Sequence, residues 1–386
     1  MITPTPPRRI VLLGATGSIG PQACDVIARH PQHFRLVGAV VGRDVSGLSA
    51  LVQRFAIDRC AVMAPAAGAT LPEGCGVGTD AVAEVAAMDA DVVCVAIPGA
   101  AGLAPALTAI DAGRDIALAS KEVLVMAGDI VDDRLRAGGG RLFPVDSEHS
   151  ALWQCLRGED PATVAKLILT ASGGPFLERA IETLGSASPD EALRHPNWDM
   201  GPKVTIDSAT MMNKGLEIIE AHHLFNIPYE RIEVMIHPSS VIHSLVEFSD
   251  GATMAQAGIP DMRIPIALAL TGGRRLDEVV ESVDLVAASP LRFHAVDAQR
   301  FRAVELAREA GVRGGVVPAA LNAANEVAVA AFLEGRLRFD QIIPTVAATV
   351  AVTVDPTEVT LETILAADAH ARLVAAELVA GAGVHA

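Results

Sequence analysis

The first 150 residues alternate short runs of Val, Ile and Leu with longer segments of helical spacing. Strands of a parallel sheet carry helices on both faces, so they are apolar along their whole length, and each needs a crossover to reach the next. The sequence therefore predicts a Rossmann-like, doubly wound parallel α/β domain over residues 1–150. Its predicted strands are Ile10–Leu13, Arg35–Val41, Val92–Ile97, Ile116–Ala119 and Leu142–Val145.

Beyond residue 150 the pattern changes, and an α+β middle domain is predicted over 151–285. Two segments there flank a Ser-Asp-Gly turn and are typical of an antiparallel hairpin, Val241–Phe248 and Thr253–Gln256. The further predicted elements are strands at Lys166–Thr170 and Ile232–Ile236 and a helix at Met211–Leu224. A linker over 286–315 and a small helical domain over 316–386, with helices at Ala319–Leu333 and Leu361–Val379, complete the expected architecture.

Charge and hydropathy argue against two classes of partner. The formal net charge of −16 is unlike that of a general nucleic-acid binder, which carries a basic face. Val92–Ile110 has no charged residue, but Pro98, Gly99, Gly102 and Pro105 interrupt it, so a buried strand, a turn and a helix start explain it better than a membrane span. The apolar run after Arg9 is too short for a signal peptide. We expect a soluble, cytoplasmic protein.

The five cysteines are scattered and include no C-x-x-C pair. This pattern indicates neither a disulfide framework nor a thiolate zinc site, and it suits a reducing compartment. The sequence therefore predicts that each thiol is a small buried apolar group: Cys24, Cys60, Cys75, Cys94 and Cys155.

A glycine-rich loop, Gly14-Ala-Thr-Gly17-Ser-Ile-Gly20, follows the first predicted strand and opens a helix. Glycine lets the backbone turn tightly and approach a pyrophosphate, while a helix N-terminus offers free N–H groups. The spacing is G-x-x-G-x-x-G rather than G-x-G-x-x-G, so a tight turn without a ligand is the alternative. The strand–turn–helix context favours a dinucleotide.

The end of the second strand indicates which nicotinamide cofactor binds. NAD sites usually place an acidic residue here, whereas an arginine favours the 2′-phosphate of NADP. The chain has Gly42-Arg43-Asp44, so Arg43 favours NADPH, and Asp44 beside it is the contrary feature. The alternative is that Arg43 is a solvated surface charge.

Three acidic residues are candidate ligands of a divalent cation. Asp146 and Glu148 follow the fifth strand, and in an extended chain they would point to one side. Glu217 lies on the helix predicted over Met211–Leu224, with Asn213 one turn before it on the same face. Oxygen ligands of this kind suit Mg²⁺ or Mn²⁺, although adjacent acids are often only surface groups.

A second polar group has the composition of a phosphate cradle. Ser172-Gly-Gly follows a strand, and Ser208, Asn213 and Lys214 are expected at and within the start of the later helix. The polar segment 194–202 contains His195 and Trp198 and has no periodic apolar face, which favours a ligand-covering lid. A loop docked on the core by Trp198 is the alternative. The histidines His222, His223, His237 and His243 are expected to serve packing or hydrogen bonding.

These residues together resemble one family, 1-deoxy-D-xylulose 5-phosphate reductoisomerase. The longest similar runs are His195-Pro-Asn-Trp-Asp-Met-Gly and Asp207-Ser-Ala-Thr-Met-Met-Asn-Lys-Gly-Leu-Glu217. The loop Gly14–Gly20 and five further runs are similar in the family's order: Lys121-Glu122, Asp146-Ser-Glu-His149, Ser172-Gly-Gly-Pro-Phe176, His237-Pro-Ser-Ser-Val-Ile-His243 and Leu321-Asn-Ala-Ala-Asn-Glu-Val327. The resemblance implies an NADPH- and metal-dependent conversion of 1-deoxy-D-xylulose 5-phosphate to 2-C-methyl-D-erythritol 4-phosphate in non-mevalonate isoprenoid synthesis.

The resemblance also implies residue roles. Catalysis would rest on Lys121, Asp146, Glu148 and Glu217, of which the three acids would hold Mg²⁺ or Mn²⁺, with Co²⁺ as a further option. The substrate, bound mainly around its phosphate, would contact Lys121, Ser147, Glu148, Ser172, His195, Ser208, Asn213, Lys214 and Glu217. NADPH would lie against Thr16, Gly17, Ser18, Ile19, Gly42, Arg43, Asp44, Ser120, Glu122 and Gly201. A homodimer is expected from the family.

Three positions depart from the family pattern: Ser120 and Asp44 stand where Asn is expected, and Pro202 where a basic residue is common. Two other functions fit the sequence less well. A semialdehyde dehydrogenase needs an activated cysteine, but Cys155, the cysteine nearest the substrate domain, lies in an apolar helical pattern. An NADP-binding sensor or inactive relative predicts loss of catalytic groups, yet the acids, Lys121 and Lys214 are present.

Overall fold

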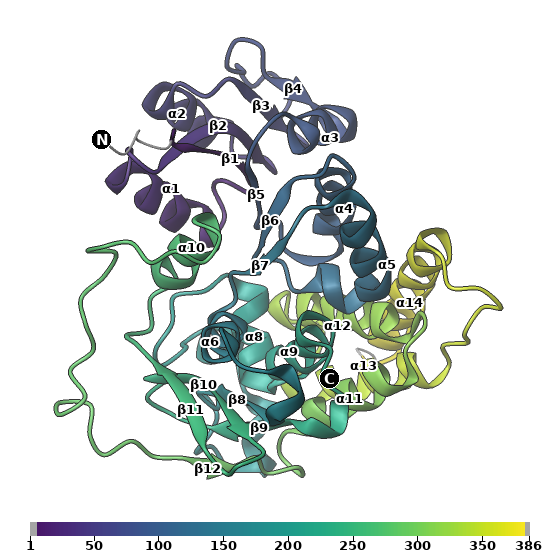
Figure 1. Cartoon of the computed structure of the whole chain (residues 1–386). Helices are drawn as coiled ribbons and strands as arrows, with labels where there is room; N and C mark the ends of the chain where they lie inside the picture. Colours follow the sequence, from purple (N-terminus) through teal and green to yellow (C-terminus); the bar gives the residue numbers. More distant parts are fainter. Residues whose placement is uncertain (1–5, 383–386) are drawn as a thin grey trace. The chain divides into compact units, whose positions relative to one another are not determined.

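The computed structural model describes residues 6–382, which form two units (Figure 1). Unit 1 consists of the chain up to Val123 together with Val131–Ser150 and Asp261–Glu281. Unit 2 consists of Leu124–Ile130, Ala151–Pro260 and the chain from Ser282 onward. Neither unit is one continuous stretch of sequence. The predicted domain limits at 150, 285 and 315 therefore stay predictions.

Unit 1 is built on a seven-stranded sheet in which every pair of neighbouring strands is parallel. The strands are β1 (Arg8–Leu13), β2 (Phe34–Val41), β3 (Arg59–Val62), β4 (Gly76–Val77), β5 (Val92–Val95), β6 (Asp115–Leu118) and β7 (Leu142–Pro144). Their order, β4-β3-β2-β1-β5-β6-β7, reverses direction at β1, which confirms the doubly wound Rossmann-like fold. Strands β3 and β4 were not predicted, because four and two residues are too few to show an apolar pattern.

Helices cover both faces of this sheet. They are α1 (Ile19–Arg29), α2 (Val45–Phe55), α3 (Gly78–Ala87), α4 (Leu103–Asp111), α5 (Glu122–Gly138) and α10 (Arg263–Leu270). Helix α5 is interrupted at Ala127 (φ −145°, ψ 35°), and its residues Leu124–Ile130 belong to unit 2. Helix α10 reaches unit 1 from far along the sequence and packs on α1 (Figure 1).

Side-chain contacts hold α10 in unit 1. Arg263 Nη1 lies 3.0 Å from Asp25 Oδ2 on α1, and Arg8 Nη1 on β1 donates to the Leu270 carbonyl at 2.8 Å. The helix is apolar and mostly buried from Pro265 to Leu270. Helix α1, which follows the glycine-rich loop, is thus supported by a segment that follows it by more than two hundred residues.

Unit 2 contains a five-stranded mixed sheet of order β11-β10-β8-β9-β12. Its strands are β8 (Val164–Ala171), β9 (Ile232–Ile236), β10 (Ile242–Phe248), β11 (Thr253–Ala257) and β12 (His294–Ala295). Strands β10 and β11 are antiparallel, as the hairpin prediction required, while β8 and β9 run parallel. The two-residue strand β12 was not predicted.

The helices of unit 2 are α6 (Ser147–Leu156, whose first turn belongs to unit 1), α7 (Pro189–Ala192), α8 (Pro202–Thr210), α9 (Met212–Phe225), α11 (Arg302–Arg313), α12 (Val317–Leu333), α13 (Ile342–Ala351) and α14 (Leu361–Ala382). Helix α12 is central and buried nearly all round, packed against α8, α11, α13 and α14. Short 3₁₀ helices lie at Gly99–Gly102, Pro161–Thr163, Ile181–Ser186, Tyr229–Arg231 and Phe339–Gln341.

Two helices of the C-terminal region were not predicted. The expected linker 286–315 contains α11, whose buried face is small and periodic (Ala303, Val304, Ala307 and Ala310), a pattern masked by its many charged residues. Helix α13 was also missed, because its Thr and Val residues have low helix propensity and packing against α12 decides its structure.

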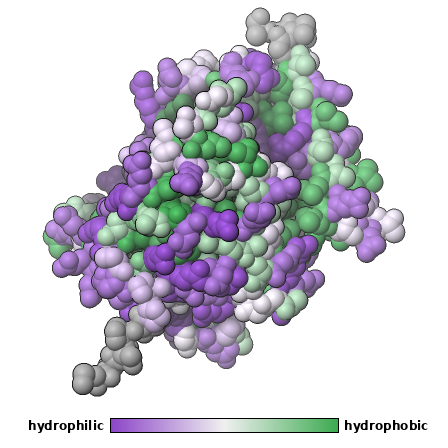
Figure 2. Space-filling model, turned by 90° about the horizontal axis from the view of Figure 1, so that it is seen from above, coloured by the Kyte–Doolittle hydropathy of each residue, from purple (hydrophilic) through white to green (hydrophobic). Residues whose placement is uncertain are grey.

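Four of the five cysteines are buried, and Cys75 is half-buried. None of the helices formed by residues 6–382 combines the length and apolar character needed to traverse a bilayer. Hydrophilic and hydrophobic residues are intermixed over the face seen in Figure 2.

Candidate functional site

The glycine-rich loop between β1 and α1 is shaped by backbone proximity. Gly14 has φ +88°, and a Cβ built on it would lie 2.3 Å from the Ala96 carbonyl oxygen, so only glycine fits here. The Gly17 amide donates to the Gly14 carbonyl at 3.0 Å, which closes the turn. Gly17 and Ser18 are exposed at the start of α1, where no side chain caps the helix. The uncapped first turn of α1 and the positive end of its helix dipole are suited to an anion.

The predicted cofactor residues Gly42, Arg43 and Asp44 follow β2 in the same unit. Asp44 caps α2: its Oδ1 accepts from the Gly47 amide at 2.9 Å and from Ser46 Oγ at 3.2 Å. Arg43 is exposed, and its guanidinium makes no hydrogen bond or ion pair with other residues of the described range 6–382. The Asp44 carboxylate is therefore occupied by the helix, while Arg43 remains available to an anion.

Ser120, Lys121 and Glu122 connect β6 to α5 and are all buried. The Ser120 hydroxyl lies 2.6 Å from the Ile97 carbonyl oxygen and 3.2 Å from that of Val95, so it is directed to the backbone after β5. Lys121 turns the other way, and its Nζ lies 2.7 Å from Asp146 Oδ2. This ion pair was not predicted from the sequence.

Asp146, Ser147 and Glu148 do not continue β7 in an extended conformation, so the predicted strand alternation was wrong, but a carboxylate oxygen of Asp146 and one of Glu148 do lie within 4.8 Å of each other. Strand β7 ends at Pro144, and Ser147 and Glu148 form the first turn of α6. Asp146 precedes the helix and accepts from the Glu148 amide at 3.2 Å. The Ser147 hydroxyl contacts the Glu148 carboxylate. The helix N-terminus, rather than strand alternation, gathers the negative charge here.

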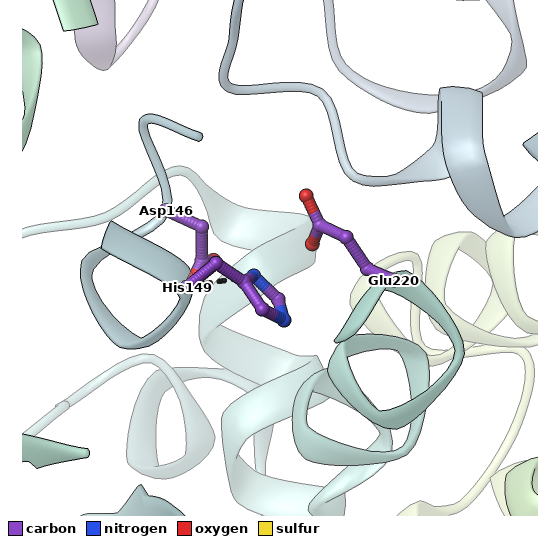
Figure 3. Close-up of side chains that lie close together, drawn as sticks. All are labelled: Asp146, His149 and Glu220. Atoms are coloured by element: carbon purple, nitrogen blue, oxygen red, sulfur yellow. Dashed lines mark ion pairs between the residues drawn. The ribbon is translucent and has the colours of Figure 1, made fainter. Parts of the chain in front are cut away.

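His149 lies beside Asp146 on the first turn of α6, as Figure 3 shows, with its Nδ1 3.4 Å from Asp146 Oδ1. The imidazole is fully buried. The Asp146 carboxylate thus has Lys121, His149 and a helix N-terminus around it within unit 1.

Glu217 lies on α9 in unit 2 and is 0% exposed. Asn213, one turn earlier, donates to Glu217 Oε1, and Lys214 pairs with Oε2. The prediction that Asn213 and Glu217 share a helix face is confirmed. Glu220, drawn in Figure 3, is a second buried acid one turn further along α9. Burying a carboxylate is costly unless it is paired. Asn213 and Lys214 supply that pairing for Glu217.

The predicted phosphate-binding residues of unit 2 lie at neighbouring turns. Ser172 Oγ accepts from the Gly174 amide at 3.1 Å, and a Cβ on Gly174 would lie 2.6 Å from the Ser208 carbonyl oxygen. Ser208 belongs to α8 and not to the start of the later helix as expected, because Met211 (φ 64°) separates α8 from α9. Asn213 and Lys214 then form the first turn of α9.

His195 organises the segment 194–202. Its Nδ1 accepts from the Asn197 and Trp198 amides at 3.2 and 3.0 Å, so the neutral ring carries its proton on Nε2. Nε2 lies 2.9 Å from Ser172 Oγ and is the donor of that bond. The Ser172 hydroxyl, which accepts from two N–H groups, keeps its own proton for a ligand.

The same segment is docked on the turn that follows β9. The Asn197 side-chain amide donates to the Pro238 carbonyl at 2.6 Å and to Ser240 Oγ at 2.9 Å. The Trp198 side chain is half-buried, and the centroid of its ring lies 6.0 Å from the centroid of the His243 ring. His237 Nδ1 donates to the Arg292 carbonyl at 2.7 Å, in keeping with its expected hydrogen-bonding role. The contacts of Asn197 were not predicted, since nothing in the sequence links it to residues 238–240.

Gly201, the last of the predicted cofactor residues, precedes α8, and Pro202 occupies that helix's first turn. The structure therefore groups Lys121 with Asp146 and its neighbours in unit 1. It groups Ser172, His195 and Ser208, and separately Asn213, Lys214 and Glu217, in unit 2.

Comparisons with known proteins cover almost the whole chain. Residues 10–128 match the family described as 1-deoxy-D-xylulose 5-phosphate reductoisomerase, residues 142–225 its C-terminal domain, and residues 257–374 a further DXP reductoisomerase C-terminal domain. The 1-deoxy-D-xylulose 5-phosphate reductoisomerase of Ralstonia nicotianae is 48% identical over 377 residues, covering 94% of this chain and 96% of the relative. That of Thermomicrobium roseum is 47% identical over 381 residues, covering 98% and 99%.

Solved structures agree. The reductoisomerase from Zymomonas mobilis in complex with NADPH is 42% identical, with a TM-score of 0.89, and the match covers 97% of this chain and 99% of that one. A DOX-P reductoisomerase in complex with NADPH, fosmidomycin and magnesium is 39% identical, with a TM-score of 0.89 and coverage of 96% and 98%.

Proposed function

Because the chain belongs to the 1-deoxy-D-xylulose 5-phosphate reductoisomerase family, we propose that its polar clusters are the cofactor, cation and substrate sites of that reaction. The activity is the NADPH- and divalent-metal-dependent isomerisation and reduction of 1-deoxy-D-xylulose 5-phosphate to 2-C-methyl-D-erythritol 4-phosphate, in non-mevalonate isoprenoid precursor synthesis. The chain is thus an NADP-dependent oxidoreductase whose cofactors are NADPH and Mg²⁺. The observation that carries this conclusion is sequence identity of 48% and 47% to two reductoisomerases over nearly the full length of the chain.

Asp146, Glu148 and Glu217 are the proposed cation ligands. All three are carboxylates, the ligands that Mg²⁺ prefers, and each is already oriented by neighbouring donors. Lys121 and Lys214 balance the charge of Asp146 and Glu217. Asp146 and Glu148 belong to unit 1 and Glu217 to unit 2. Mn²⁺ and Co²⁺ are proposed as substitutes.

NADPH is proposed to bind across the C-terminal edge of the unit 1 sheet. Thr16, Gly17, Ser18 and Ile19 form the free start of α1, which fits a pyrophosphate. Gly42 has open space around its Cα, and Arg43 beside it fits the 2′-phosphate, with Asp44 turned toward α2. Further contacts are assigned to Ser120, Glu122 and Gly201. The Ser120 hydroxyl is directed to Ile97, so this contact is weaker than an asparagine would make.

The substrate phosphate is proposed to lie among Ser172, His195, Ser208, Asn213 and Lys214. The Ser172 hydroxyl has a proton to donate, since its oxygen already accepts from His195 and Gly174. Four of these side chains are partly exposed, whereas Lys214 is buried and brings a positive charge from within. Binding energy from the phosphate, which does not react, is available to orient the reacting carbons.

When bound, the cation polarises the α-hydroxyketone, and NADPH supplies the hydride that reduces the rearranged aldehyde. Lys121, Ser147 and Glu148 are assigned to the hydroxyl end of the substrate, and Asp146 keeps the Lys121 ammonium in place there. The segment 194–202 is proposed as a lid, with Asn197 as its attachment to the turn at 238–240. We also propose a cytoplasmic homodimer.

The purified chain should consume NADPH when 1-deoxy-D-xylulose 5-phosphate and Mg²⁺ are present, and the product should be 2-C-methyl-D-erythritol 4-phosphate. Chelation should stop the reaction and added Mg²⁺ or Mn²⁺ should restore it. Undiminished turnover after exhaustive chelation would refute the cation assignment. A semialdehyde dehydrogenase activity is disfavoured, because burial raises the pKa of the Cys155 thiol to about 11.

A further inference from the structure

Asp207 is a buried carboxylate that the proposed function leaves unused. It lies in the last turn of α8 and is 1% exposed. Lys203 Nζ, one turn earlier on the same helix, lies 2.9 Å from Asp207 Oδ2. Asn325, on the central helix α12, donates from Nδ2 to Asp207 Oδ1 at 2.7 Å. Asp207 therefore links the two ends of α8 through Lys203. Through Asn325 it also links α8 to α12, in the helical C-terminal part of unit 2.

Helix α8 is short, and both its ends adjoin residues of the proposed site. It spans Pro202–Thr210 and begins directly where the segment 194–202 ends. Ser208, next to Asp207 in sequence, is a proposed phosphate ligand, and the Gly174 turn packs against its carbonyl. Any rotation of α8 about its axis would move the Ser208 hydroxyl and the attachment of the lid together.

Asn325 is fully buried, and it is an unusual choice for packing alone. Its Oδ1 has no hydrogen-bond partner among residues 6–382, so the amide leaves one polar atom unsatisfied. An unsatisfied buried polar atom is destabilising. A buried ion pair is likewise weak evidence for stability, since apolar groups of similar volume can do as well. The geometry is better suited to fixing one orientation of α8 than to strengthening the core.

We propose that Asp207 and Asn325 are positioning residues, which fix α8 on α12 and so place Ser208 for the substrate phosphate. The proposal rests on the assignment of Ser208 to the phosphate. It gives the helical C-terminal region a role in substrate affinity, although none of its own residues is assigned to the site.

The test is an exchange of the two side chains. Asn325→Asp places two carboxylates against each other, and the double variant Asp207→Asn with Asn325→Asp restores an amide–carboxylate bond between α8 and α12. Asn325→Asp should raise KM for the sugar phosphate and Ki for inorganic phosphate by roughly tenfold or more, the scale of one hydrogen bond to a charged group. KM for NADPH should change less than about twofold. The double variant should recover most of the phosphate affinity.

Asp368→Asn is the matched control. Asp368 is also a buried acid, and it pairs at 2.8 Å with Arg372, one turn away on the same helix α14, and not with a residue of α8. This variant should lower the thermal midpoint and leave both KM values unchanged. If Asn325→Asp does not fold, Asn325→Ser, which is too short to reach Asp207, takes its place.

Three results would overturn the proposal: an Asn325 variant that lowers the thermal midpoint without changing phosphate affinity, equal changes in both KM values, or a folded double variant with no recovery. Failure of the wild-type chain to turn over the sugar phosphate would instead refute the proposed function. Unchanged phosphate affinity in Ser208→Ala would refute the phosphate assignment on which the inference depends.

Discussion

Lys121 Nζ and Asp146 Oδ2 lie 2.7 Å apart, with the two side chains only 8% and 12% exposed. Lys121 ends the loop after β6 and Asp146 the loop after β7, so adjacent parallel strands bring them together. The pair links a proposed cation ligand to a proposed substrate contact. Changes at either residue should therefore affect the cation and the substrate together.

Asp146→Asn should raise the Mg²⁺ concentration needed for half-maximal activity by at least about tenfold, since even groups that only orient a metal ligand contribute 10–100-fold. The amide keeps the shape but loses the charge that attracts the ion. Activity measured over a Mg²⁺ titration checks this, with the exposed Asp133→Asn as control. An unchanged titration curve would remove Asp146 from the ligand set.

Glu217→Gln should lower kcat by roughly a thousandfold or more, because it removes a cation ligand whose loss affects the transition state, at several kcal/mol. NADPH binding, measured by fluorescence titration, should stay intact, since Glu217 belongs to unit 2 and the glycine-rich loop to unit 1. Near-normal turnover in saturating Mg²⁺ would show that Glu217 is not a ligand.

Arg43→Ala should raise KM for NADPH by roughly tenfold or more and leave KM for NADH nearly unchanged, because a charge-assisted hydrogen bond to the 2′-phosphate would be lost. Steady-state kinetics with both cofactors is the measurement. Arg35→Ala, an exposed arginine on β2 paired with Asp58, is the matched control. Equal changes for the two cofactors would contradict contact with the phosphate.

Gly14→Ala should destabilise unit 1 by about 3 kcal/mol or more, since a residue with a Cβ would be strained at φ +88° and would meet the Ala96 carbonyl at 2.3 Å. Gly17→Ala is the contrast: its nearest neighbour would be 3.4 Å away, so stability should hold while NADPH affinity falls. Denaturant unfolding and NADPH titration of both variants separate these effects. Similar stability of the two variants would show that the Gly14 turn can relax.

His223 should make the chain less stable in mild acid. Burial is the main reason that its pKa falls from the ordinary 6.5 to about 4; Asp129 opposes this shift, and nearby His222 adds to it. The folded chain thus keeps the ring neutral between pH 6.5 and 4, where the unfolded chain takes up a proton. Stability is retained above pH 6.5 and falls by about 3 kcal/mol as the pH drops to 4.

Urea unfolding of the wild type and His223→Gln at pH 7 and pH 4 measures this contribution as a difference between the two pH dependences. The glutamine variant should lose less stability in acid. An identical pH dependence would mean that the ring is already protonated, or exposed, in the folded chain.

Much of the fold could be predicted because it depends on local patterns. The apolar runs of β1, β2 and β5 are long enough to be recognised, and the glycines at 14, 17 and 20 mark the turn between β1 and α1. Helix α8 was missed because Val204 and Thr205 have low helix propensity. Its helical structure depends on Pro202 at the first turn and on the burial of Ile206.

In the candidate site, too, contacts between residues close in sequence could be predicted, whereas contacts between distant residues could not. Asn213 and Glu217 are four residues apart, so helical spacing alone predicts their contact, which the structure confirms. Lys121 and Asp146 are 25 residues apart and Asp207 and Asn325 are 118 apart, and no periodicity relates such positions. The extended conformation predicted for Asp146–Glu148 was wrong because β7 ends at Pro144 and helix α6 begins at Ser147.

Helix α10, which supports α1 from far along the chain, limits how the protein can be dissected. A fragment ending at residue 150 would contain every strand of the parallel sheet but would expose the apolar side of α1 that α10 covers. An isolated nucleotide-binding module would have to be engineered by grafting residues 261–281 onto that fragment.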